Sequence, residues 1–151
     1  MILAGMGLKV AGMDYLLEPL LEAAGARGRR GPAFVNADLM AAPFKEGVFD
    51  LALDWGVFHH IRRKDTDGYL RRVAALLGKD GRLLLACFST KFRHEGETAR
   101  KRNYTVHHGH YDRFSTRSEL KDTFSPWFKI TAMEERKAGY FLLDMKLKKD
   151  K

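Results

Sequence analysis

The segment from Phe49 to Ile61 reads FDLALDWGVFHHI and carries the strongest fold signal in the chain. Its first five residues are typical of a short strand, and Asp54 comes where that strand would end. Further on, residues 82–88 are almost continuously apolar, which is typical of a parallel strand with both faces covered. Between the two, residues 67–77 carry apolar side chains at helical spacing, namely Tyr69, Val73, Leu76 and Leu77. A strand, a helix and a second strand in this order predict an α/β fold.

The same alternation continues toward both ends of the chain. Residues 9–13 and 33–36 are expected to be short strands, with a helix over 18–24 between them that tolerates Pro19 in its first turn. Thr116 and Glu119 have the spacing of a capping box, which predicts a helix reaching Phe124. Two strands, 127–133 and 140–147, are close enough in sequence to form an antiparallel hairpin. The expected fold is therefore a mostly parallel sheet with a C-terminal antiparallel hairpin.

Residues 89–112 are polar, aromatic and basic, and they show no periodic pattern. A segment of this length without regular structure is long for a simple connection, and such loops tend to be functional. We expect it to be a mobile lid over a pocket.

Length and composition limit the possible classes of protein. The chain has 151 residues, which predicts one domain over 1–151. Its longest apolar run is far short of the roughly 20 residues that cross a bilayer, and residues 1–12 lack the basic start of a signal peptide. The single cysteine, Cys87, excludes an internal disulfide and a cysteine zinc cage. We therefore expect a cytoplasmic protein with no membrane partner.

The net charge of +8 is unevenly distributed. Residues 62–151 carry 22 basic and 12 acidic side chains, whereas residues 1–61 carry 5 and 7. This excess of basic side chains is consistent with a nucleic-acid-binding module built on residues 100–102, Arg113 and Arg117 with interleaved tyrosines. A basic surface that keeps the protein soluble explains the same charge, and we favour that explanation.

Three of the expected strands are each followed by an acidic residue: Asp14, Asp38 and Asp54. In an open parallel sheet, ligands bind in the crevice beyond the carboxyl ends of the strands. A carboxylate at this place can accept hydrogen bonds from ribose hydroxyls or from an exocyclic amine. Each aspartate can also serve as a local cap of the turn that follows it, and for Asp54 this alternative has equal weight.

These motifs resemble those of class I S-adenosylmethionine-dependent methyltransferases. The resemblance rests on VAGMD at residues 10–14, on Asp38-Leu39 with Pro43-Phe44, on residues 49–54 and 57–61, and on residues 76–85. It covers nearly the whole chain and implies a Rossmann-like fold with S-adenosylmethionine as cofactor. The motifs identify the superfamily but not the acceptor.

The resemblance also implies cofactor-binding roles for six residues. Asp14 would hold the ribose hydroxyls, and Tyr15 would lie beside the adenosine. Asp38 would reach the adenine amine while Leu39 packs on the ring. Asp54 and Trp55 would face the methionine end of the cofactor.

One feature of that family is missing from the expected pattern. The family begins with a strand, an acidic residue and a G-x-G-x-G loop, and Gly5-Met6-Gly7 does not supply them. Only Leu8 and Lys9 separate Gly7 from the next strand, and parallel neighbours need a crossover of about a dozen residues. We interpret residues 2–7 as the tail of a helix. The expectation is a truncated methyltransferase-like domain without its first central strand.

Histidines and aromatic residues gather in the second half of the chain. His94, His107, His108 and His110 show no recognised ligand spacing with a cysteine or carboxylate, so we expect no metal. A group of aromatic residues can line an acceptor pocket or belong to the core: Phe88, Phe92, Tyr104, Tyr111 and Phe114. No catalytic residue is assigned, and His60 and Tyr111 are the substrate-side candidates.

The function expected from these observations is methyl transfer from S-adenosylmethionine to a small-molecule acceptor. Positioning accounts for most of such catalysis, so a dedicated acid or base is not required. One alternative is a non-catalytic or fragmentary domain that needs an upstream segment or a partner. The other is the basic nucleic-acid-binding module. The oligomeric state does not follow from the sequence.

Overall fold

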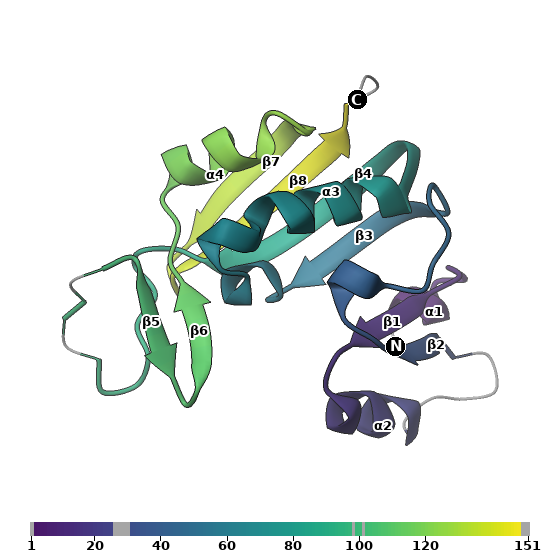
Figure 1. Cartoon of the computed structure of the whole chain (residues 1–151), viewed down its shortest axis with the longest axis horizontal. Helices are drawn as coiled ribbons and strands as arrows, with labels where there is room; N and C mark the ends of the chain where they lie inside the picture. Colours follow the sequence, from purple (N-terminus) through teal and green to yellow (C-terminus); the bar gives the residue numbers. More distant parts are fainter. Residues whose placement is uncertain (1, 26–30, 98, 101, 149–151) are drawn as a thin grey trace. The chain divides into compact units, whose positions relative to one another are not determined.

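The computed structural model describes residues 2–25, 31–97, 99–100 and 102–148, and Figure 1 shows their helices and strands. The chain divides into two compact units, Met1–Phe44 and Lys45–Lys151.

The first unit contains a parallel pair of strands. Its elements in chain order are α1 (Ile2–Gly5), β1 (Ala11–Asp14), α2 (Leu17–Gly25), β2 (Ala33–Asn36) and the 3₁₀ turn η1 (Leu39–Ala41). Strand β1 pairs with β2 in parallel, with Asp14 opposite Asn36. The strands are close-packed at Gly12, because a Cβ there would lie 2.8 Å from the Phe34 ring.

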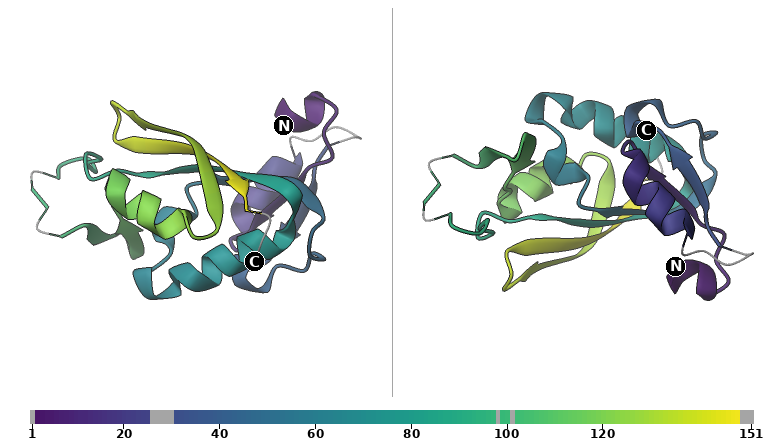
Figure 2. Two further views of the ribbon diagram at one scale, coloured as in Figure 1. Left: turned by 90° about the horizontal axis from the view of Figure 1, so that it is seen from above. Right: turned by 90° about the horizontal axis from the view of Figure 1, so that it is seen from below.

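The second unit is built on a four-stranded mixed sheet of order β3-β4-β8-β7. Its strands are β3 (Phe49–Trp55), β4 (Leu77–Phe88), β7 (Phe128–Arg136) and β8 (Tyr140–Leu147). Strand β3 is parallel to β4, and β8 is antiparallel to both of its neighbours. The helices α3 (Thr66–Leu76) and α4 (Arg117–Phe124) lie on the same side of this sheet, as Figure 2 shows.

Aromatic and aliphatic side chains fill the space between this sheet and its helices. The ring of Phe58, in the 3₁₀ turn η2 (Phe58–His60), lies 5.3 Å from that of Tyr69 and 4.9 Å from that of Phe124. All three side chains are fully buried. Strand β4 is buried at Leu83 and from Leu85 to Phe88, with Leu84 half-buried, which agrees with its apolar run. This core fixes η2, the turn that follows β3, in place.

Most of the predicted elements are confirmed with small shifts at their ends. The capping box is present, since the amide of Glu119 donates to Thr116 Oγ1 at 3.1 Å. Residues 2–5 are helical, which agrees with the interpretation of this segment as the tail of a helix. Residues 79–81 read Lys-Asp-Gly, which is typical of a turn and predicts one between α3 and the strand, but they are part of β4, where the register with β3 shifts and Asp80 adopts a φ of 68°.

The prediction of an irregular segment over residues 89–112 is wrong in its second half. An antiparallel hairpin stands there, formed by β5 (Tyr104–His107) and β6 (His110–Arg113). Its turn is His108-Gly109, with φ values of 48° and 82°. A histidine rarely takes a positive φ, so this turn does not have the Asn-Gly signature by which hairpins are found in a sequence.

Within the described residues, β3 pairs with β4 and with no other strand. Three large apolar side chains of β3 are exposed, Leu51 by 37%, Leu53 by 52% and Trp55 by 75%. One edge of β3 is therefore open in the second unit.

Candidate functional site

Asp14 and Tyr15 end β1 and begin the turn toward α2. Asp14 Oδ1 accepts a hydrogen bond from the amide of Leu16 at 2.9 Å, and the Tyr15 side chain is 65% exposed. The side-chain Nδ2 of Asn36 donates to the backbone carbonyls of both residues, at 3.0 and 2.9 Å. Asn36 thus fixes the turn that presents Asp14, a role that the sequence analysis missed because the contact crosses between two strands.

Asp38 and Leu39 follow β2. The Asp38 carboxylate caps η1, because Oδ1 accepts from the amide of Met40 at 2.9 Å. Asp38 is exposed and Leu39 is half-buried. Both aspartates of the first unit therefore use one oxygen for a local turn. A carboxylate has about four lone-pair sites, so this use is compatible with a ligand contact.

Asp54 is different, since its side chain is buried within the second unit. Its oxygens accept from the amide of Val57 at 2.8 Å, the amide of Phe58 at 3.1 Å and the hydroxyl of Tyr69 at 2.6 Å. Burial raises the pKa of Asp54, and these hydrogen bonds act in the opposite direction. Burial beside this carboxylate also raises the pKa of Tyr69 well above its usual value.

The geometry of Asp54 matches the loop-capping alternative considered for it. Three donors surround its two oxygens, and the turn from β3 into η2 is built on them. In contrast to Asp54, the next residue, Trp55, has an exposed side chain.

The six predicted cofactor residues are divided between the two units. Asp14, Tyr15, Asp38 and Leu39 belong to the first unit, where β1 and β2 bring the two aspartates to the carboxyl ends of paired strands. Asp54 and Trp55 belong to the second. A common site for all six stays a prediction.

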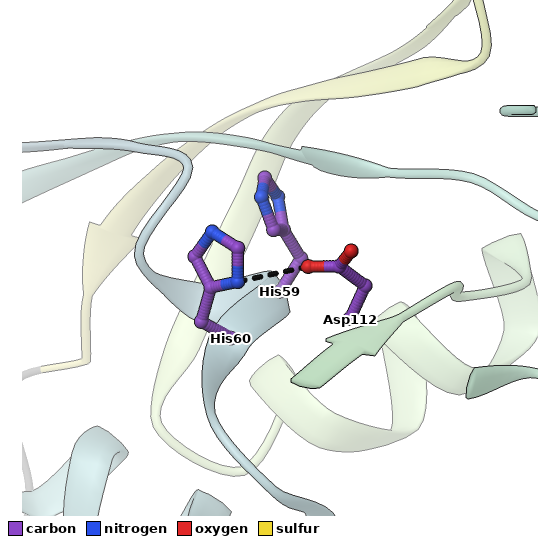
Figure 3. Close-up of side chains that lie close together, drawn as sticks. All are labelled: His59, His60 and Asp112. Carbon is purple, nitrogen blue, oxygen red and sulfur yellow. Dashed lines mark ion pairs between the residues drawn. The ribbon is translucent and has the colours of Figure 1, made fainter. Parts of the chain in front are cut away.

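A cluster of polar side chains lies where η2 meets β6 (Figure 3). His60 Nδ1 is 2.9 Å from Asp112 Oδ1 and 3.1 Å from the carbonyl oxygen of Tyr111. His59 is buried and stacks on Phe88 with 3.7 Å between ring centroids. Burial lowers the pKa of His59 to about 3, so its imidazole is neutral near pH 7. The two substrate-side candidates, His60 and Tyr111, are thus neighbours.

The aromatic group considered for an acceptor pocket contributes largely to the core. Phe88 and Phe114 are buried, and Phe92 stacks on Phe88 with 3.8 Å between centroids. Tyr104 and Tyr111 stack on each other across the β5–β6 hairpin. Only these two tyrosines remain candidates for contact with an acceptor.

The basic residues considered for nucleic acid are partly used inside the protein. Arg113 is buried and pairs with Glu119 at 2.8 Å, and Arg100 pairs with Glu97 while lying over the Phe114 ring. Arg117 donates to the carbonyl of Met133. Lys101 lies outside the described residues. The described arginines thus supply fewer free cations than the sequence suggests.

These features define the class of the protein. A parallel strand pair with an aspartate at or just after the end of each strand, together with a mixed sheet whose last two strands are antiparallel, is an α/β fold of the Rossmann-like type. Residues 1–85 match the model of the methyltransferase domain family, and the chain belongs to this family.

Solved structures share the fold of this chain. The 1,6-didemethyltoxoflavin-N1-methyltransferase of Burkholderia thailandensis is 25% identical, with a TM-score of 0.74 over 93% of this chain and 62% of that one. A S-adenosylmethionine-dependent methyltransferase of Methanosarcina mazei is 18% identical, with a TM-score of 0.74 over 97% of this chain and 85% of that one. One from Mesorhizobium loti is 15% identical, with a TM-score of 0.73 over 91% and 80%. No curated protein matches the chain.

The resemblance to class I S-adenosylmethionine-dependent methyltransferases is therefore confirmed, and with it S-adenosylmethionine as the cofactor of the class. The chain spans about three fifths of the length of the Burkholderia enzyme. Among the described residues, no helix is long and apolar enough to cross a bilayer.

Proposed function

We propose that this chain takes part in methyl transfer from S-adenosylmethionine to a small-molecule acceptor. The observation that carries the proposal is the β1–β2 pair, with Asp14 at the end of β1 and Asp38 just after β2, within a chain that belongs to the methyltransferase domain family. The similarity to an enzyme that methylates a nitrogen of 1,6-didemethyltoxoflavin supports a small-molecule acceptor.

In the proposed site the first unit binds the nucleoside part of the cofactor. The Asn36 side chain donates hydrogen bonds to the carbonyls of Asp14 and Tyr15. The Asp14 carboxylate is therefore positioned at the end of β1 before the ribose binds. Charge-assisted hydrogen bonds from the two ribose hydroxyls to a carboxylate are stronger than those between neutral groups. Asp38 stands at the same edge of the strand pair and would receive the adenine amine.

The chemistry is an in-line displacement at carbon. A lone pair on a nitrogen, oxygen or sulfur atom of the acceptor attacks the methyl carbon of the sulfonium, and the carbon–sulfur bond breaks. S-Adenosylhomocysteine leaves with the electron pair of that bond. Holding the two reactants in line supplies most of the rate enhancement. On the acceptor side we propose contacts with the exposed edge of His60 and with Tyr111.

Transfer of an isotopically labelled methyl group tests this function. The chain is incubated with labelled S-adenosylmethionine and a panel of small heteroaromatic acceptors that includes 1,6-didemethyltoxoflavin. We expect label to appear in at least one acceptor and the Asp14→Ala variant to transfer less. Label found only in protein or nucleic acid would contradict a small-molecule acceptor.

A second candidate function follows from the open edge of β3. An unpaired strand edge with exposed apolar side chains such as Leu53 and Trp55 is normally covered. We propose as the alternative that cofactor binding needs a further strand along β3, from an upstream segment or a partner. Cofactor binding by this chain is compared with binding by a chain extended with its upstream coding sequence. Binding by the longer chain alone supports this alternative, and equal binding by both contradicts it.

The single domain over residues 1–151 and the cytoplasmic location stay predictions.

A further inference from the structure

His59, His60 and Asp112 come together although Asp112 lies more than fifty residues further along the chain. The two histidines stand on η2 and the aspartate on β6, and one ligand atom from each lies within 4.8 Å of the other two. Figure 3 shows His60 Nδ1 directed at Asp112 Oδ1, 2.9 Å away, with the His59 ring beside them. The wide separation in sequence explains why the spacing of the histidines alone predicts no metal.

Two of these side chains are buried, His59 with 6% and Asp112 with 3% of its surface exposed. His59 Nδ1 has no hydrogen bond partner, and the one close polar contact given for Asp112 Oδ1 is that with His60 Nδ1 at 2.9 Å. Buried polar atoms are nearly always satisfied in native proteins, so each such atom requires an explanation.

A divalent metal ion explains these atoms together. Imidazole nitrogen and carboxylate oxygen are ligands of zinc and of other first-row divalent ions. We infer that His59, His60 and Asp112 bind one such ion, with Zn²⁺ as the expected occupant. His60 has 49% of its side chain exposed, so the ion would keep a coordination position open to solvent.

The surroundings hold two of the three ligands in position. The His59 ring is stacked on Phe88, and the start of η2 is fixed by the Asp54 carboxylate through the amide of Phe58. Asp112 is paired with Thr105 in the β5–β6 hairpin. An ion would therefore bind to a largely preformed site, and only the exposed His60 ring would have to adjust.

Two other arrangements compete with this assignment. In the first, His60 Nδ1 keeps its proton and donates to the carbonyl oxygen of Tyr111 at 3.1 Å, and no ion binds. In the second, an ion binds on the other side of Asp112, where Oδ2 lies 3.0 Å from His94 Nε2 and His107 is adjacent. Substitutions of single histidines separate these possibilities.

Calorimetric titration with zinc chloride tests the inference on the full chain after treatment with a chelator. We expect one Zn²⁺ per chain and a higher melting temperature in its presence, because an ion that binds only the native state stabilises it. His60→Ala is the main variant, because its exposed side chain can be removed without disturbing the core. It should weaken binding at least tenfold, and Asp112→Asn should do the same.

Two matched histidine variants serve as controls. His110→Ala removes an exposed histidine of the same hairpin, and His107→Ala removes a ligand of the competing site. Both should bind Zn²⁺ as the parent chain does. Absence of Zn²⁺ binding by the parent chain, or an equal loss of Zn²⁺ affinity in His110→Ala, would overturn the inference. Loss of Zn²⁺ affinity in His107→Ala, with full affinity in His60→Ala, would overturn it in favour of the competing site with His94 and His107. Because no cofactor is present, the result is independent of the proposed methyl transfer.

Discussion

Replacement of Asp54 by alanine tests whether this residue is the structural cap of the turn after β3. The substitution removes the acceptor of two backbone amides, Val57 and Phe58, and of the Tyr69 hydroxyl. A buried donor left without an acceptor costs about 1–3 kcal/mol. Val57 is exposed, so water can replace the carboxylate there, whereas Tyr69 is fully buried and cannot recruit water.

Removal of the buried carboxylate also offsets part of this loss of stability, because burying a charged group destabilises the folded state. Burial raises the pKa of Asp54, which means that the charged form is disfavoured in the folded state. We therefore expect a net loss of about 2–4 kcal/mol in the free energy of unfolding, from one to two unsatisfied donors. Urea unfolding followed by circular dichroism measures it.

Asp50→Ala is the matched control, since Asp50 is an exposed aspartate on the same strand. It should change the free energy of unfolding by less than about 0.5 kcal/mol. If Asp54→Ala were no more destabilising than Asp50→Ala, the carboxylate would not be a structural cap. It would then be available for the methionine end of the cofactor, as the family resemblance implies.

Three further predictions follow from the same contacts. Thr116→Ala should cost about 1 kcal/mol in unfolding free energy by removing the N-cap of α4, with exposed Ser118→Ala as control; equal effects would contradict the cap. In hydrogen exchange, Leu83–Phe88 should be the most protected segment and residues 93–97 among the fastest, with the 104–113 hairpin between them; protection of 93–97 equal to that of β4 would make this segment a core element. Binding to RNA or DNA should be weak, independent of sequence and strongly reduced by salt; submicromolar binding at physiological salt that Arg102→Ala reduces would favour the nucleic-acid alternative.

The sequence predicted the regular elements well where a single local signal determines them. The apolar run before Cys87 identified β4, and the Thr116–Glu119 spacing identified α4, because both signals lie within a few residues. The β5–β6 hairpin was missed because a His-Gly turn carries no strong local signature. The extent of β4 was underestimated for a similar reason, since Asp80 and Gly81 read as a turn but continue the strand through a register shift.

The candidate site was less accessible to sequence reasoning. The sequence predicted the positions of Asp14 and Asp38 at strand ends. It did not predict the hydrogen bond from the Asn36 side chain to the Asp14 carbonyl, because that bond depends on the β1–β2 register. The contact of His60 with Asp112 likewise joins residues that are distant in sequence. Contacts of this kind follow from tertiary packing and leave no periodic or spaced pattern.

The most direct test of the central claim is calorimetric titration of the chain with S-adenosylhomocysteine. We expect binding that Asp14→Ala weakens by about 1–3 kcal/mol through lost charge-assisted hydrogen bonds. Glu22→Ala, which removes an exposed acidic side chain of α2 in the same unit, should leave the affinity unchanged. Absence of binding, both by this chain and by one extended upstream, would contradict the assignment of a cofactor-binding methyltransferase.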